Sequence, residues 1–124
     1  MTKEDLLGKE LSNLYAIAKQ VNHYFNDSDI SFLSEREQQL LMTYVEFSCA
    51  NEADTSEHLR ALQVNPGNTI DSIVTEITEN LQHIATEKGV GKKVRELGYM
   101  MSFNRLVAYH TANMENIGYL LEEE

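Results

Sequence analysis

Residues 54–77 read DTSEHLRALQVNPGNTIDSIVTEI, and the way this stretch divides into helices decides the fold. Residues 55–62 begin with side chains that cap a helix, so a short helix is expected there. Pro66, the only proline of the chain, stands beside Gly67, and this pair predicts a tight turn. A second helix should follow from Asn68 or the next residue. The stretch therefore predicts a helix, a turn and a helix.

Helical periodicity continues on both sides of this stretch. Residues 3–25 place apolar side chains at alternating spacings of three and four, which is the pattern of a helix with one apolar face. Ser34 and Glu37 form a capping box, which predicts a helix that starts at Ser34 and fades near the polar residues 51–54. Residues 92–122 repeat the heptad spacing and predict one long final helix.

Alternation of polar and apolar residues with a period of two is nearly absent, so the sequence predicts an all-α fold of about five helices. A short hairpin in residues 86–97 is the one candidate for a sheet. The length of 124 residues suits a single domain, residues 1–124. Within it we expect a helix-turn-helix-like unit over residues 33–85, flanked by the helices of residues 3–25 and 92–122.

The sequence lacks the motifs that are typical of disulfide bonds, secretion, membrane spans and catalysis. The lone Cys49 cannot form an internal disulfide, and a small buried residue is its expected role. The charged residues 1–10 do not resemble a secretory signal, and the apolar runs are too short to span a membrane, so we expect a cytoplasmic protein without a membrane partner. Phosphate-binding loops, nucleophile elbows and the helical spacings of metal ligands are not found. We therefore expect no enzyme activity, no metal and no cofactor.

The central region resembles a known DNA-binding unit. From Leu33, the text LSEREQQLL resembles the first helix of the LuxR-type domain, and TSEHLRALQVNPGNTIDSIV is similar to the helix-turn-helix that follows it. Long helices on both sides are also similar to the layout of MarR-type repressors, whose terminal helices pair two subunits. The resemblance covers residues 33–80, but Arg60 replaces the usual small residue and Gln63 the usual glycine. It implies a dimeric transcription regulator.

The charge of this region opposes DNA binding. The chain has a formal net charge of −10 at pH 7, and residues 26–83 contain eleven acidic but only two basic residues. Such a surface repels a phosphate backbone. A solvated face that keeps the protein soluble is the plainer interpretation. We favour regulatory protein binding, in which an acidic helical face meets a partner with a basic surface. The residues expected on that face are Glu52, Asp54, Glu57, Asp71, Glu76 and Glu79.

The charge balance reverses in residues 88–105. This segment supports a second interpretation, a transcription regulator that contacts DNA phosphates through a wing or the start of the last helix. A charged start of a long helix is the plainer explanation. The residues available for phosphate contacts are Lys88, Lys92, Lys93 and Arg95.

Two apolar helix faces are difficult to bury within one small chain, so we expect a homodimer that shares them across a two-fold axis. His110 falls within the second face and is expected to be a buried residue whose ring needs a hydrogen-bond partner. The residues of this predicted dimer seam are Leu7, Leu11, Leu14, Val21, Phe103, Val107, His110, Met114, Ile117 and Leu121.

Residues 98–109, GYMMSFNRLVAY, form the most apolar part of the chain. Their apolar side chains point in too many directions for one helix face, which is typical of a central helix packed by several neighbours. They support a third interpretation, an immunity or chaperone-like helical bundle in which an apolar groove around Met100 and Met101 holds a peptide.

Overall fold

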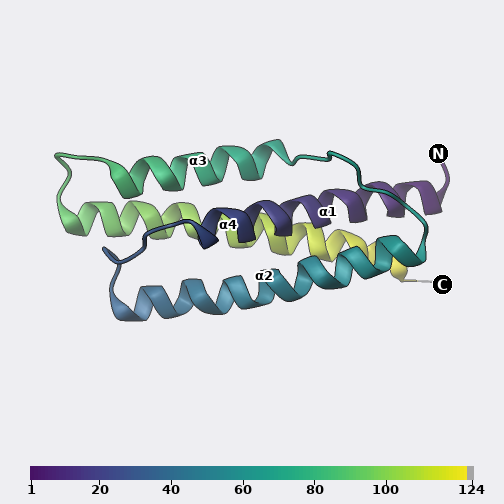
Figure 1. Ribbon diagram of the computed structural model, residues 1–124, viewed down its shortest axis with the longest axis horizontal. Coiled ribbons are helices and arrows are strands. Elements are labelled where there is room, and N and C mark those ends of the chain that lie inside the picture. Colours follow the sequence, from purple (N-terminus) through teal and green to yellow (C-terminus); the bar gives the residue numbers. More distant parts are fainter. Residues whose placement is uncertain (123–124) are drawn as a thin grey trace.

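The computed structural model describes residues 1–122, and these residues form a bundle of four helices without a strand (Figure 1). The last two residues of the predicted domain, 123 and 124, lie outside the described part. The all-α class is confirmed, whereas the expectation of about five helices is wrong and the candidate hairpin is not formed within residues 1–122. The four helices are α1 (Lys3–Asn26), α2 (Glu35–Ala61), α3 (Ser72–Thr86) and α4 (Lys92–Leu121).

The helix starts follow local capping signals. The predicted capping box is confirmed, because the Ser34 hydroxyl accepts a hydrogen bond from the Glu37 amide while the Glu37 carboxylate accepts one from the Ser34 amide. Thr2 and Asp5 form a second capping box at the start of α1. These reciprocal bonds satisfy backbone donors that have no partner inside the helix.

Helix α2 is continuous through residues 51–54, where the sequence predicted a loop. The segment contains neither glycine nor proline, and two of its polar side chains, those of Asn51 and Glu52, have partners on other helices. The Thr55 hydroxyl donates to the carbonyl oxygen of Asn51 one turn earlier, and the Asn51 side chain contacts His110 of α4. Asn51, a polar residue that suggests a loop in the sequence, is therefore a buried member of a helix.

The end of α2 is a Schellman motif, which closes the helix before Pro66 is reached. The Gln63 amide donates to the Arg60 carbonyl, and the Val64 amide donates to the Leu59 carbonyl. Gln63 adopts the left-handed conformation that this motif requires, with φ of 59°. The proline lies in the connection to α3 rather than at the helix end.

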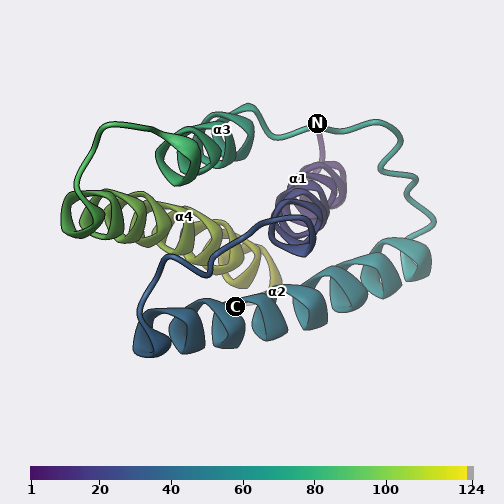
Figure 2. The same ribbon diagram turned by 60° about the vertical axis from the view of Figure 1, so that its left-hand side comes forward.

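The helix-turn-helix arrangement predicted for residues 33–85 is not formed. Helix α1 packs against the other three helices and lies between α2 and α3, as both views show (Figures 1 and 2). A recognition helix needs its partner helix beside it across a short turn. Here α3 packs against α4 and α1 instead.

The helices alternate in direction. Helices α2 and α4 run in one direction, and α1 and α3 run in the other (Figure 1). The core has two parts along the bundle. One contains Ile17, Val21, Leu33, Leu41, Tyr44, Val74, Leu81, Tyr99, Phe103 and Leu106, and the other contains Leu11, Leu14, Leu59 and Ile117.

Most of the predicted dimer seam is buried within the single chain. Helix α1 is surrounded by three helices, so its apolar face needs no second copy. On α4, Val107 and Met114 are partly buried against the two core clusters, whereas Leu121 is exposed. Leu7 is also partly buried. The buried seam residues are Leu11, Leu14, Val21, Phe103, His110 and Ile117.

Candidate binding groove between two parallel helices

An apolar groove with a volume of about 780 Å³ lies between α2 and α4. Both helices pack on α1, but their facing sides remain open to solvent along several turns. The groove includes Met100 and Met101, the residues for which the sequence suggested a groove. The residues that line it are Leu40, Thr43, Tyr44 and Phe47 of α2, and Leu97, Met100, Met101, Phe103, Asn104, Val107 and Thr111 of α4.

Large apolar side chains line the groove and remain exposed. Met101 is 57% exposed, Leu40 50%, Leu97 49% and Phe47 39%. Scattered exposed apolar residues are normal on a protein surface, but a contiguous set in a concave site is typical of binding surfaces. Leu40 and Leu41 are neighbours on α2, and only Leu41 is buried.

Aromatic rings form the floor of the groove. The ring of Tyr44 meets that of Phe103 edge to face, with centroids 5.5 Å apart, and meets His110 at 5.6 Å. Phe25 of α1 contacts both Tyr44 and Phe103 from below. Because edge-to-face pairs prefer specific geometry, this floor holds a defined shape beneath the exposed side chains of Met101 and Leu97.

His110 is fully buried beside this floor and has a partner at each ring nitrogen. Its Nδ1 lies 2.6 Å from the Tyr44 hydroxyl, and its Nε2 lies 2.9 Å from Oδ1 of Asn51. With an amide oxygen at Nε2, the ring proton belongs on Nε2, so the Tyr44 hydroxyl donates to Nδ1. The predicted role of His110 as a buried residue with a hydrogen-bond partner is confirmed.

Burial sets the protonation of this network. It lowers the pKa of His110 to about 4 and raises the pKa of the Tyr44 hydroxyl above its ordinary range. Both side chains are therefore neutral at pH 7. The three buried side chains link α2 to α4 beneath the groove without placing a charge there.

The structure does not gather the predicted acidic residues on one face. Asp71 is buried, so the expectation that it is exposed is wrong. Its carboxylate caps α3 by accepting from the Val74 amide and also accepts from the Tyr109 hydroxyl at 2.6 Å. Glu52 is half-buried and accepts from the Asn22 side chain. The exposed members are Asp54 and Glu57 on α2, and Glu76 and Glu79 on α3, with α1 between the two helices.

The predicted phosphate-binding residues differ in their exposure to solvent. Lys88, Lys92 and Lys93 are exposed at and before the start of α4. Arg95 is half-buried, with its guanidinium 4.7 Å from the ring centroid of Phe32 and one nitrogen donating to the Ala85 carbonyl. The side chain of Arg95 is thus used to pack the end of the bundle.

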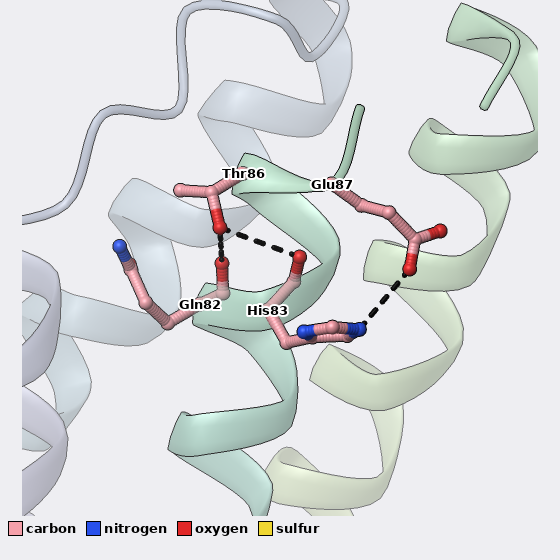
Figure 3. A network of polar contacts seen from close by, with 4 residues as sticks. All are labelled: Gln82, His83, Thr86 and Glu87. Atoms are coloured by element: carbon pink, nitrogen blue, oxygen red, sulfur yellow. Dashed lines mark hydrogen bonds and ion pairs between the residues drawn. The ribbon is translucent and has the colours of Figure 1, made fainter. Parts of the chain in front are cut away.

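The other histidines do not assemble a metal site within the described residues. Figure 3 shows His83 one turn from Glu87, with its Nε2 3.1 Å from the carboxylate at the exposed end of α3. The Thr86 hydroxyl donates to the carbonyls of Gln82 and His83 in the same turn. In residues 1–122, no three histidine, cysteine, aspartate or glutamate side chains lie close enough together to hold a metal ion.

Comparison with known protein families, curated proteins and solved structures gives no match to this chain. Among residues 1–122, none of the helices combines the length and apolar character that crossing a membrane requires. The fold and the groove therefore define the class of this protein as a four-helix bundle with an open apolar groove.

The sequence revealed only part of this groove. The apolar segment around Met100 and Met101 was recognised because it is apolar on several sides of one helix. Leu40 and Phe47 were not recognised, since residues on the α2 side have ordinary helical spacing. The adjacent leucines Leu40 and Leu41 are a signal that could have revealed the α2 side of the groove. Neighbouring residues point to different sides of a helix, so both cannot be buried against the same neighbouring helix.

Proposed function

We propose that this protein is a non-catalytic binding protein that holds an amphipathic helix of a partner protein in the groove between α2 and α4. The observation that carries the proposal is the continuous apolar surface formed by Leu40, Phe47, Leu97 and Met101 over a rigid aromatic floor. Binding would bury side chains that are half exposed to water in the free protein.

The shape of the groove suits a helix. Leu97 and Met101 lie one turn apart on α4, and Leu40 and Phe47 lie two turns apart on α2. A third helix laid between two parallel helices can insert apolar side chains at intervals of three and four residues into this spacing. Methionine side chains adapt to different partners because they are unbranched and polarisable.

The net charge of the chain indicates that the partner helix is also basic. With a net charge of −10, the protein attracts positively charged molecules and repels nucleic acid and acidic proteins. Glu46 and Asp54 are exposed on α2, the helix that forms one side of the groove. We therefore propose a partner helix that is apolar on one side and basic on the other, which retains the basic partner inferred from the sequence.

The other two interpretations have less structural support. An acidic docking face would need Asp54 and Glu57 to lie near Glu76 and Glu79, but α1 separates them. A DNA-binding regulator would rely on Lys88, Lys92 and Lys93 without a recognition helix beside them. Neither arrangement offers the contiguous surface of the groove.

A peptide with leucines on one helical face and lysines on the other provides a direct test. Its affinity for the protein is measured by fluorescence anisotropy, and Met101→Glu is expected to weaken binding by about tenfold or more, since a carboxylate would be buried against apolar groups. Met42→Glu is the matched control, because Met42 is 54% exposed on α2 but outside the groove.

Circular dichroism establishes that both variants keep the helical fold. Failure of the wild-type protein to bind the peptide, or an equal loss of affinity in the two variants, would contradict the proposal. The equal charge of the two variants separates insertion into the groove from general attraction between an acidic protein and a basic peptide.

A further inference from the structure

The groove has a direction, because α2 and α4 are parallel and in register. Tyr44 contacts Phe103, and Asn51 contacts His110 two turns further along both helices. The N-termini of the two helices therefore lie at one end of the groove, and both helices continue beyond its other end toward their C-termini (Figure 1). Since aligned peptide dipoles place a partial positive charge at a helix N-terminus, the two N-termini together favour negative charge at the end of the groove near them.

Exposed carboxylates lie beyond the far end of the groove. Asp54 is exposed on α2 and shares a small cavity with Met114 of α4, which places it beyond the end of the groove at Thr111. Glu57 follows one turn later on α2 and Glu115 lies on the last turns of α4, both exposed. Their charges are opposed at this end by Arg60 on the last turn of α2.

The opposite end is positive by comparison. Lys92 and Lys93 occupy the first turn of α4, whose N-cap Gly91 supplies no side-chain bond to the helix amides. Lys93 lies close enough to Glu37 to help lower the pKa of its carboxyl group, after the larger effect of the Ser34 amide. In the first turns of the two helices, the carboxylates Glu35, Glu37 and Glu96 are opposed by the cations Arg36, Lys92, Lys93 and Arg95.

We infer that the partner helix lies antiparallel to α2 and α4, with basic residues concentrated in its N-terminal half. This inference rests on the proposed function of the groove. In that orientation the positive end of the partner's own dipole and its basic side chains meet Asp54 and Glu57, while its negative C-terminal end meets Lys92 and Lys93. The partner would then run in the same direction as α1 (Figure 1).

Two peptides of identical composition test the orientation. Both carry the same leucines along one helical face, but one has its lysines in the N-terminal half and glutamates in the C-terminal half, and the other has these charges exchanged. The first peptide is expected to bind the wild-type protein about fivefold more tightly at low salt, with the difference shrinking as salt is added.

Charge reversal in the protein identifies the end responsible. The double variant Asp54→Lys with Glu57→Lys should abolish or invert the preference between the peptides. The matched control is Glu76→Lys with Glu79→Lys, which changes the charge equally at the same residue spacing but on α3, and it should retain the preference. A nitroxide on the N-terminus of the first peptide should broaden the amide signals of Asp54 and Met114 more than that of Lys93.

The outcomes separate the two proposals. If neither peptide binds, the proposed function fails. If both bind equally and Met101→Glu weakens both, the groove binds helices but the inferred orientation is wrong. Self-association of the protein that Met101→Glu abolishes, measured by light scattering, would overturn the inference by showing that a second copy fills the groove.

Discussion

The Tyr44 hydroxyl donates a hydrogen bond of 2.6 Å to Nδ1 of a fully buried histidine, His110, and thereby joins α2 to α4 beneath the groove. The groove lies between these two helices. Asn51 completes the network from the other side of the ring. The same buried contacts therefore stabilise the fold and define the floor of the proposed binding site.

Loss of the Tyr44 hydroxyl should destabilise the protein. Tyr44→Phe leaves Nδ1 of His110 as a buried acceptor without a donor, so we expect the free energy of unfolding to fall by about 1–3 kcal/mol. Urea denaturation measures this change. Tyr119→Phe is the control, because Tyr119 is 73% exposed on α4 and should alter stability by less than about 0.5 kcal/mol. Equal effects of the two substitutions would contradict the role assigned to the hydrogen bond.

Stability should fall as the pH is lowered below the ordinary pKa of histidine. Burial lowers the pKa of His110 from 6.5 to about 4, so the unfolded chain binds a proton at this residue more readily than the folded protein does. The contribution of the neutral ring is complete above pH 6.5 and is lost as the pH falls toward 4, amounting to about 3 kcal/mol. A midpoint above pH 6 for the His110 Cε1–H resonance, measured by NMR, would contradict this prediction.

Asp71→Ala should destabilise α3 and its packing on α4. The substitution removes the N-cap bond to Val74 and leaves the Tyr109 hydroxyl without its acceptor, so we expect a loss of about 2–3 kcal/mol. Glu76→Ala, which changes an exposed carboxylate on the same helix, should alter stability by less than about 0.5 kcal/mol. Thermal and urea unfolding of both variants check the difference, and a cost at Asp71 as small as that at Glu76 would exclude the capping role.

Gln63→Gly should stabilise the protein. Gln63 is the non-glycine residue with a positive φ among residues 1–122, and glycine adopts this conformation without the steric cost of a Cβ atom. We expect a gain of about 0.5–1 kcal/mol in the free energy of unfolding. Gln82→Gly in the interior of α3 should instead cost about 1 kcal/mol. A loss of stability in both variants would show that the conformation of Gln63 is not strained.

The groove was predictable only in part from the sequence. Met100 and Met101 could be identified because α4 is apolar on several sides around them. This property is visible in the sequence since it involves one continuous segment. The contribution of Leu40 and Phe47 depends on how far α2 lies from α4, a distance set by their packing on α1. The predicted acidic face failed for the same reason, since α1 separates Glu57 from Glu76 in space.

The sequence by itself determined the all-α class, the start of α2 at Ser34 and the extent of the first and last helices, because caps and apolar periodicity act between residues only a few positions apart. Only the tertiary structure decided that residues 51–54 continue α2 and that the two heptad faces are buried within one chain. The partner that makes Asn51 a core residue, His110, is 59 positions away, and such contacts leave no local pattern. The groove likewise arises from long-range packing, since three helices surround α1 while the α2–α4 side stays open.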